Sequence, residues 1–185
     1  MSSLIFMKII ELNISGCYLV ESKRFEDHRG SFLKIYHQEI YHEFGLNFNF
    51  AEEFYSISHR SVIRGMHFQT PPQDHEKIVY CPVGAVCDVF LDIRKSSKTY
   101  GYFSKIELTA DNGRVLFLPK GIAHGFLSLV DNSLMVYKTS TLYSPTNDAG
   151  IRWDSFGCDW GVEQPLLSAR DGGFTCFSEF ESPFG

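Results

Sequence analysis

Two strands and the turn between them are predicted by the stretch Val62-Ile-Arg-Gly-Met-His-Phe-Gln-Thr-Pro-Pro-Gln-Asp-His-Glu-Lys-Ile-Val79. Its β-branched start favours an extended strand, and the Pro-Pro pair favours a turn before the second strand begins at Lys77. An imidazole (His67), a guanidinium (Arg64) and an ammonium (Lys77) lie within 14 residues. The stretch therefore predicts a β fold and a concentration of acid–base and anion-binding groups.

The chain after residue 48 continues the strand pattern. Short apolar segments recur roughly every ten residues, with Gly, Pro, Asn and Asp between them. The predicted strands are 50–58, 77–80, 85–93, 102–108, 114–118, 125–129 and 134–141, with a further candidate at 31–36 and a turn at 82–84. Many short strands at even spacing are typical of all-β sandwiches and barrels.

The segment 85–93 separates two kinds of side chain. Val86, Asp88, Phe90 and Asp92 alternate with Cys87, Val89, Leu91 and Ile93. Because successive side chains of a strand point to opposite faces, one face is apolar and the other mixes carboxylates with apolar groups. This pattern predicts a strand with a dry outer contact and a functional inner lining. Asp88 could assist Lys77 there or satisfy a buried hydrogen bond.

Outside the strands, one early helix and an irregular tail are predicted. Ile40 and Phe44 lie four residues apart in the segment 38–44, and Gly45 suits the C-terminal cap. The tail after Tyr143 is rich in Gly and aromatic residues, so we expect it to wrap over the barrel with short helical turns. A length of 185 residues without a visible linker indicates a single domain, 1–185.

Composition restricts the partners and the compartment. Lys and Arg number 17 against 22 Asp and Glu, so the net charge of −5 argues against nucleic acid but not against a small anion. Five scattered cysteines without a CxxC pair are typical of reduced thiols in the cytoplasm. The apolar run Leu4-Ile-Phe-Met7 ends at Lys8 and lacks a basic start, so we expect no signal peptide and no membrane span.

A turn late in the chain carries a histidine at a recognisable spacing. Gly113, Pro119, Gly121 and His124 follow the pattern G-x5-P-x-G-x2-H, which resembles the second sequence motif of cupin barrels. The first cupin motif would need His-x-His and a Glu, whereas this chain has His67-Phe-Gln69. Metal sites usually have three or four protein ligands. We therefore expect a cupin-type double-stranded β-helix, or jelly-roll barrel, that works without a metal.

Seven further motifs follow one another in a fixed order. They are Arg64-Gly-Met-His67-Phe-Gln69, Lys77, Asp92-Ile-Arg-Lys-Ser-Ser97, Pro119-Lys-Gly-Ile-Ala-His-Gly-Phe126, Tyr137-Lys138-Thr139, Gly150-Ile-Arg-Trp-Asp154 and Pro165-Leu-Leu-Ser-Ala-Arg-Asp171. The set resembles the dTDP-4-dehydrorhamnose 3,5-epimerase family over about residues 16–172. That resemblance implies cofactor-free epimerisation at C3, C5 or both of a nucleotide-diphosphate 4-keto-6-deoxyhexose, in deoxysugar and polysaccharide biosynthesis.

Epimerisation next to a ketone requires three kinds of catalytic group. A hydrogen next to a ketone is acidic because its removal gives an enolate, so inversion needs a base on one face, an acid on the other and a cation near the oxygen. His67 suits the base because imidazole titrates near neutral pH. The resemblance implies that Asp171 orients His67, that Tyr137 is the acid and that Lys77 is the cation.

The resemblance also implies substrate-binding residues: Arg64, His124, Gln69, Glu52, Arg170, Arg29 and Phe32. Arg64 is a natural partner for a diphosphate oxygen. Arg29 and Phe32 match a segment whose strands pair across a homodimer, so that one subunit completes the partner's site. Glu52 and Phe54 stand where family members tend to have amides, and Lys34 where many have an acidic residue, so these departures leave the sugar nucleotide open.

Three alternatives stay open at this point. The same base and acid could serve a 3,4-ketoisomerase, or an epimerase restricted to C3 or C5 of a CDP- or GDP-linked sugar. A metal-dependent or non-catalytic cupin is the third. The remaining histidines, His28, His37, His42, His59 and His75, are interpreted as structural.

Overall fold

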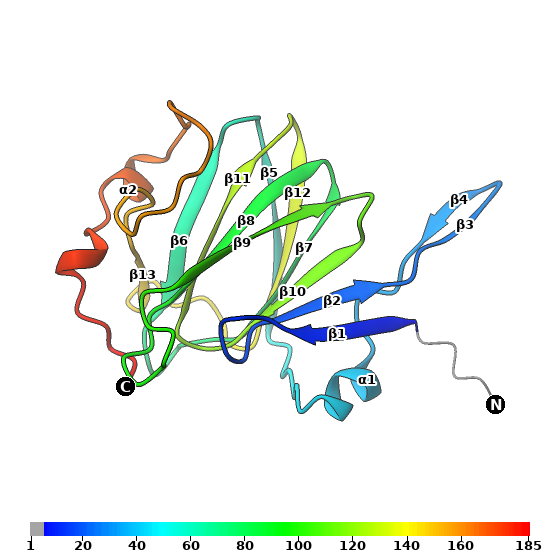
Figure 1. The fold of residues 1–185 in the computed structure, drawn as a ribbon, viewed down its shortest axis with the longest axis horizontal. Coiled ribbons are helices and arrows are strands. Elements are labelled where there is room, and N and C mark those ends of the chain that lie inside the picture. The colour runs from blue at the N-terminus through cyan, green and yellow to red at the C-terminus, as the bar shows by residue number, and fades with distance from the viewer. Residues whose placement is uncertain (1–5) are drawn as a thin grey trace.

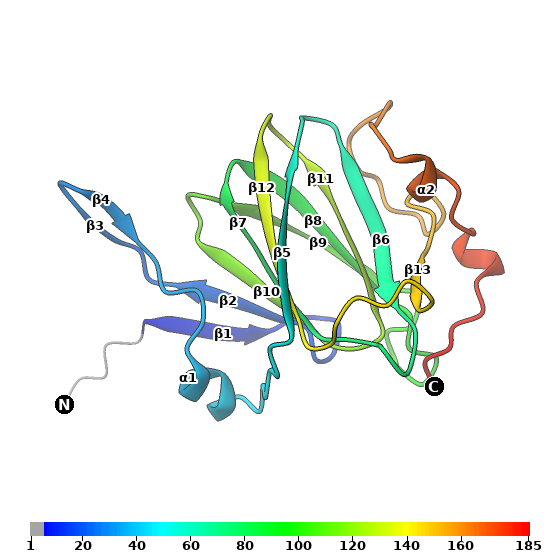
Figure 2. The same cartoon turned by 180° about the vertical axis from the view of Figure 1, so that it is seen from behind.

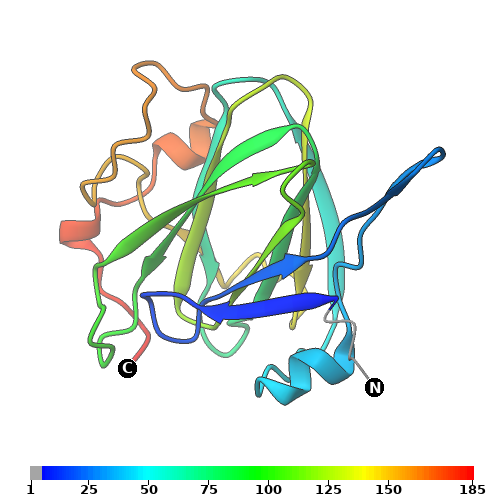
Figure 3. The ribbon, with the colours of Figure 1, turned by 45° about the vertical axis from the view of Figure 1, so that its right-hand side comes forward.

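Two antiparallel sheets that face each other form most of this computed structural model, which describes residues 6–185 (Figure 1). One sheet has the strand order β1-β2-β10-β7-β12-β5, and the other has β13-β6-β11-β8-β9. Seen from a third direction, the strands surround a common interior (Figure 3). The prediction of an all-β jelly-roll barrel is confirmed. Leu4 and Ile5 of the apolar N-terminal run lie outside the described residues.

The elements have the following bounds. The strands are β1 (Met7–Glu11), β2 (Tyr18–Ser22), β3 (Phe25–Asp27), β4 (Gly30–Phe32), β5 (Glu52–Ser58), β6 (Ile63–Gln69), β7 (Lys77–Val83), β8 (Ala85–Asp92), β9 (Phe103–Thr109), β10 (Arg114–Leu118), β11 (Ile122–Ser128), β12 (Ser133–Thr139) and β13 (Asp148–Gly150). The helices are α1 (Gln38–Glu43), α2 (Ala169–Gly172) and the 3-10 helix η1 (Phe177–Glu179).

Tertiary pairing moved several predicted boundaries. β7 continues through Pro82 to Val83 instead of turning there, because Leu134 of β12 still pairs with Val83. β11 begins at Ile122, three residues earlier than predicted, since its pairing with β8 starts at Ile122. The strand candidate 31–36 shrinks to the end of β4, which pairs only with β3. The first two differences come from partners that are distant in sequence, whereas β4 is short because its only partner is the three-residue β3.

Apolar layers on both faces of the five-stranded sheet stabilise the barrel. The interior between the sheets is filled by side chains such as Phe90, Leu116 and Phe126. The tail covers the outer face of the five-stranded sheet, where Trp160 and Phe184 pack in one cluster with residues of β6, β8 and β11. Each such buried side chain contributes roughly 1.5–3 kcal/mol. Figures 1 and 2 show the tail, including α2 and η1, on the outside of β6 and β13.

The predicted alternation along β8 is confirmed by the two clusters that its side chains join. Val86 and Phe90 lie in the interior cluster, whereas Val89 and Leu91 lie in the outer one. Asp88 is fully buried on the inner side. β8 therefore separates the lumen from the layer that the tail covers.

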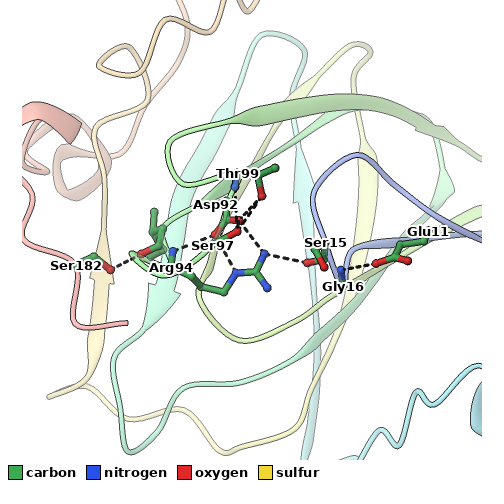
Figure 4. A network of polar contacts seen from close by, with 9 residues as sticks. Glu11, Ser15, Gly16, Asp92, Arg94, Ser97, Thr99 and Ser182 are labelled. Carbon is green, nitrogen blue, oxygen red and sulfur yellow. Dashed lines mark hydrogen bonds and ion pairs between the residues drawn. The ribbon is translucent and has the colours of Figure 1, made fainter. Parts of the chain in front are cut away.

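Asp92 ends β8 and holds a junction between loops (Figure 4). Its carboxylate accepts hydrogen bonds from the side chains of Arg94, Ser97 and Thr99 at 2.6–2.9 Å. Arg94 also donates to the backbone oxygen of Ser15 at 2.9 Å, which ties the β8–β9 connection to the β1–β2 turn. The Asp92–Ser97 motif thus has a structural explanation in this chain.

Two glycines allow β6 and β11 to approach closely. A Cβ on Gly65 would lie 2.5 Å from the Cα of Gly125, and a Cβ on Gly125 would lie 2.8 Å from the Arg64 oxygen. Gly65 also has a φ of 144°, which favours glycine. This contact sets His67 and His124 side by side in register on the two strands.

A hairpin of β3 and β4 projects from the barrel (Figures 1 and 2). Phe32, at the base of the hairpin opposite Phe25, is 61% exposed, and Arg29 in its turn forms an ion pair with Asp27 at 2.6 Å. Within residues 6–185, no helix has the length and apolar character needed to cross a membrane.

Candidate active site

A pocket of about 430 Å³ has walls from both sheets. Eight of the predicted site residues line it: Glu52, Arg64, His67, Gln69, Lys77, His124, Tyr137 and Arg170. They come from strands β5, β6, β7, β11 and β12 and from α2. Strand residues as far apart in the chain as Glu52 and Tyr137 thus contribute to one set of polar side chains.

His67 and Asp171 form a hydrogen-bonded pair at one wall. His67 Nε2 lies 2.9 Å from Asp171 Oδ1, and the Gly65 N–H donates to Asp171 Oδ2 at 3.1 Å. Ser168 caps α2 by accepting the backbone N–H of Asp171 at 3.0 Å, which fixes the acid on its short helix. Because an ionised carboxylate only accepts, Nε2 carries the hydrogen and Nδ1 is the basic nitrogen.

The pKa values of this pair suit a neutral base beside an anion. Burial lowers the pKa of His67, and the hydrogen bond and charge of Asp171 offset only part of that effect. Burial would raise the pKa of Asp171, but its hydrogen bonds and the charge of His67 lower it below its usual range. His67 is therefore neutral and oriented near pH 7, ready to accept a proton.

Lys77 places an amine against the backbone of the histidine. Its Nζ donates to the His67 oxygen at 3.0 Å, and the side chain is buried. Burial lowers the pKa of Lys77 to about 8, although Asp148 and Asp88 act in the opposite direction. The ammonium is thus charged near neutral pH and becomes neutral in mildly basic solution.

Tyr137 stands on β12, in the opposite sheet. Its hydroxyl lies 3.3 Å from Ser56 Oγ, and its ring stacks on Phe54 with centroids 4.8 Å apart. The ring of His124 meets it edge-on at 6.2 Å. Burial raises the pKa of Tyr137, so the phenol keeps its proton and can act as an acid.

His124 and Asp88 form a second pair deeper in the barrel. His124 Nε2 lies 2.8 Å from Asp88 Oδ2, and both side chains are almost completely buried. Burial raises the pKa of Asp88, more than the charges of His124 and Lys77 lower it. Both interpretations of Asp88 have support: it forms a buried hydrogen bond with His124, and its charge acts to raise the pKa of Lys77.

Arg64 and Gln69 differ in how far hydrogen bonds within the protein already occupy their side chains. Arg64 donates to Ser58 Oγ at 3.0 Å and to the Ile57 oxygen at 3.3 Å while lining the pocket. The amide of Gln69 is engaged on both sides, donating to the Gln73 oxygen at 2.7 Å and accepting from the Ser144 N–H at 2.7 Å. This geometry favours a loop-holding role for Gln69 over substrate contact.

Glu52 and Arg170 are tied to the loop that borders the pocket. Glu52 Oε2 accepts the N–H of Tyr143 at 2.7 Å, and the hydroxyl of Tyr143 donates to Asp148 at 3.2 Å. Arg170 forms an ion pair with Asp148 at 2.7 Å and lies over the ring of Phe174. These contacts join β5, β13 and α2 into one rim.

Arg29 and Phe32 do not lie in this pocket. They line a separate hollow along the β3–β4 hairpin, away from His67. The expectation for these two residues involves a partner subunit, so it stays a prediction. Lys34 is also outside the pocket, with its ammonium 5.1 Å from the centre of the Phe6 ring.

Sequence reasoning missed part of the wall. His75, which we interpreted as structural, lines the pocket, as do Ser56, Tyr143 and Asp148. Burial lowers the pKa of His75 to about 3, so it is neutral at physiological pH. Its position two residues before Lys77 was an available signal, because residues at that spacing in extended chain share a face. Within residues 6–185, no group of three or more His, Cys, Asp or Glu side chains has an arrangement that could hold a metal ion.

The jelly-roll barrel carries a His–Asp pair at one wall of its pocket and a buried phenol on the opposite sheet, an arrangement that can serve a cupin-like isomerase. The family model for dTDP-4-dehydrorhamnose 3,5-epimerase matches residues 11–179, and the chain belongs to that family. A Shigella flexneri protein named dTDP-4-dehydrorhamnose 3,5-epimerase is 40% identical over 168 residues, 89% of this chain and 93% of that protein. The resemblance found in the sequence is confirmed.

Two further relatives bear on the substrate. The Legionella pneumophila dTDP-6-deoxy-D-glucose-3,5-epimerase, solved in complex with dTDP-4-keto-L-rhamnose, is 32% identical with a TM-score of 0.90 and 95% coverage of both chains. A Streptomyces niveus protein named dTDP-4-dehydrorhamnose 3-epimerase is 35% identical, covering 89% of this chain and 81% of that protein.

Proposed function

We propose that this isomerase epimerises a dTDP-linked 4-keto-6-deoxyhexose at C3, C5 or both, through an enolate. The observation that carries the proposal is the placement of His67 and Tyr137 on opposite sheets around one pocket. A planar enolate between them is open to proton removal from one side and proton delivery from the other.

The residues then have the following roles. His67 Nδ1 takes the hydrogen from the carbon next to the ketone, and the electron pair moves onto the ketone oxygen. Lys77 stabilises that oxygen by its charge. Tyr137 gives its phenolic proton to the opposite face of the carbon, and Ser56 can donate a hydrogen bond to the resulting phenolate. The imidazolium and the phenolate return to their starting states by proton exchange with water.

Asp171 orients His67 through the 2.9 Å contact and stabilises the imidazolium once it forms. Arg64 is the candidate contact for the diphosphate, because a guanidinium matches phosphate geometry. His124, Glu52 and Arg170 complete the wall around the sugar. The Streptomyces relative with a 3-epimerase name keeps the C3-only reaction as an alternative.

The test is deuterium wash-in. Incubating dTDP-4-dehydro-6-deoxyglucose in heavy water and following the C3 and C5 protons by NMR should show exchange and inversion at one carbon or both. Exchange at neither carbon, with dTDP-, CDP- and GDP-linked sugars alike, would contradict the proposal. A shifted carbonyl in the carbon spectrum would instead identify a ketoisomerase.

The partner surface of the protein is a second part of the proposal. Phe32 on the projecting hairpin and Tyr55, Ile57 and Val83 on the sheet surface are exposed apolar groups. A homodimer that exchanges N-terminal strands would cover them and carry Arg29 and Phe32 to the neighbouring pocket. Analytical ultracentrifugation should give a dimer for the wild type and a weaker one for Phe32→Asp. A monomer in both cases would contradict this arrangement.

We also propose that the chain works as a single domain in the cytoplasm. The family match over residues 11–179 and the shared pocket support one domain, with a core at about 16–172. In the described part of the chain, the five cysteines are all free, as is usual in a reducing compartment. Fractionation of the native host, with the protein in the cytosol, is the check.

A further inference from the structure

Phe54 faces Tyr137 directly across two paired strands. The two residues are register partners in the β5–β12 ladder, and their rings are nearly parallel, at 14° and 4.8 Å between centroids. Phe54 lines the pocket and is 46% exposed. A phenyl ring at this place offers no hydrogen bond to a substrate, so its effect must be exerted through shape or through Tyr137.

The contacts of Tyr137 show what Phe54 contributes. Ser56, two residues further along β5, holds the phenolic oxygen at 3.3 Å. His124 meets the ring edge-on, at 71° between the planes. Phe54 covers the ring with its flat face. The hydroxyl and the ring plane of Tyr137 are thus held by separate contacts, and two of these three come from β5.

The stack of Phe54 on Tyr137 could serve only to stabilise the sheet. Aromatic pairs across strands stabilise sheets, and β5 is the end strand of its sheet. That explanation requires only burial of the ring, however, and Phe54 leaves nearly half of its surface exposed beside the proposed acid.

We propose that Phe54 is a positioning residue that holds the Tyr137 ring so that its hydroxyl points at one face of the enolate. The proposal rests on the function proposed above. An enolate has two fates: Tyr137 protonates it on the far face, giving inversion, or His67 returns a proton to the original face. Loss of the Phe54 ring should shift this ratio toward return without slowing the first proton removal.

The experiment measures both fates in heavy water. NMR follows the deuterium incorporated into substrate that keeps its original configuration, and the amount of inverted product. The proteins compared are the wild type, Phe54→Ala, Phe54→Leu and Phe54→Tyr. The ratio of exchange to inversion should rise about three- to tenfold in Phe54→Ala and Phe54→Leu, as expected from the strength of an aromatic pair. Phe54→Tyr, which keeps the flat ring, should restore the wild-type ratio.

A matched control separates positioning from stability. Phe44→Ala removes a phenyl ring of similar exposure, 48%, at the end of α1, and should leave the ratio unchanged. An unchanged ratio in Phe54→Ala overturns the proposal, whether or not the overall rate falls, because a structural or binding role would slow both fates together. Wild-type protein that neither exchanges nor inverts would instead count against the proposed function, so the two failures are distinguishable.

Discussion

Two His–Asp pairs, whose histidines lie on the neighbouring strands β6 and β11, differ in how accessible their side chains are. The His67–Asp171 and His124–Asp88 contacts are equally short, at 2.9 and 2.8 Å. The His67 side chain is 31% exposed, whereas that of His124 is 3% exposed. Asp171 receives a second hydrogen bond, from the Gly65 N–H, while Asp88 Oδ1 has no partner among residues 6–185.

The environment therefore decides what identical side chains can do. Asp171 has a lowered pKa and stays anionic beside an accessible imidazole. Asp88 has a raised pKa in a dry interior and faces a histidine that water hardly reaches. Under the proposed function, the first pair takes a proton, and the second holds the Tyr137 ring and tunes the pKa of Lys77. The following predictions test that division, from the largest effect to the smallest.

Replacing His67, the more accessible of the two histidines, should have the largest effect. His67→Asn removes the proposed base, so exchange at both carbons should fall by about 10³-fold or more. The measurement is deuterium wash-in with saturating sugar nucleotide. Residual exchange within about tenfold of the wild type would show that another group is the base.

Replacing its carboxylate partner should have a smaller but specific effect. Asp171→Asn keeps the shape but removes the charge that orients and stabilises the imidazolium, so kcat should fall by about 10²-fold with little change in KM. The same change should lower the pKa of His67, because the raising influence of Asp171 is lost. The acidic limb of the pH–rate profile should then move to lower pH.

The pH profile should also report Lys77. Its pKa of about 8 means that the rate declines above pH 8, roughly tenfold per unit, as the ammonium is lost. Stability should change in the opposite sense, because between about 8 and 10.5 the unfolded chain binds more protons than the folded one. Lys77→Met should remove both dependences, as rates and urea midpoints across that range would show.

Replacing Asp88 in the buried His124–Asp88 pair should give the smallest change in rate. Asp88→Asn should lower activity by no more than about tenfold, since Asp88 acts only through its neighbours. Because burial raises the pKa of Asp88, the folded state of the wild type loses stability as the pH rises from about 3.9, the usual value of an aspartate. The variant should flatten that dependence in thermal melts. A loss as large as that of His67→Asn would end the division between the pairs.

Local sequence predicted elements whose pattern is self-contained. The segment 114–118 matches β10, and 38–44 matches α1 to within a residue. β13 has only three residues and exists because Asp148 to Gly150 pair with β6, about 80 residues earlier. No periodicity can announce such a pairing. Only part of the short β3–β4 hairpin was predicted, because the His28-Arg29 turn lacks the glycine that is typical of two-residue hairpins.

The site divides in a similar way. His67, Arg64 and Lys77 were visible as a cluster because they lie on one hairpin-like stretch. Asp171 and Tyr137 were found only through the family resemblance, since their contacts span 104 and 81 residues to His67 and Ser56. The engaged amide of Gln69 could not be foreseen, because its partners Leu142 and Ser144 lie on a loop that follows β12, and only Gln73 is near in sequence.

The place of Asp171 on the tail has a consequence for synthesis of the protein. A growing chain that has left the ribosome as far as β12 holds His67, Lys77 and Tyr137, but its imidazole has no carboxylate to orient it. The His67 imidazole gains its orienting hydrogen bond only after α2 has been made and has docked outside β6. Under the proposed function, full enolising activity therefore requires that the segment carrying α2 has been made and has docked.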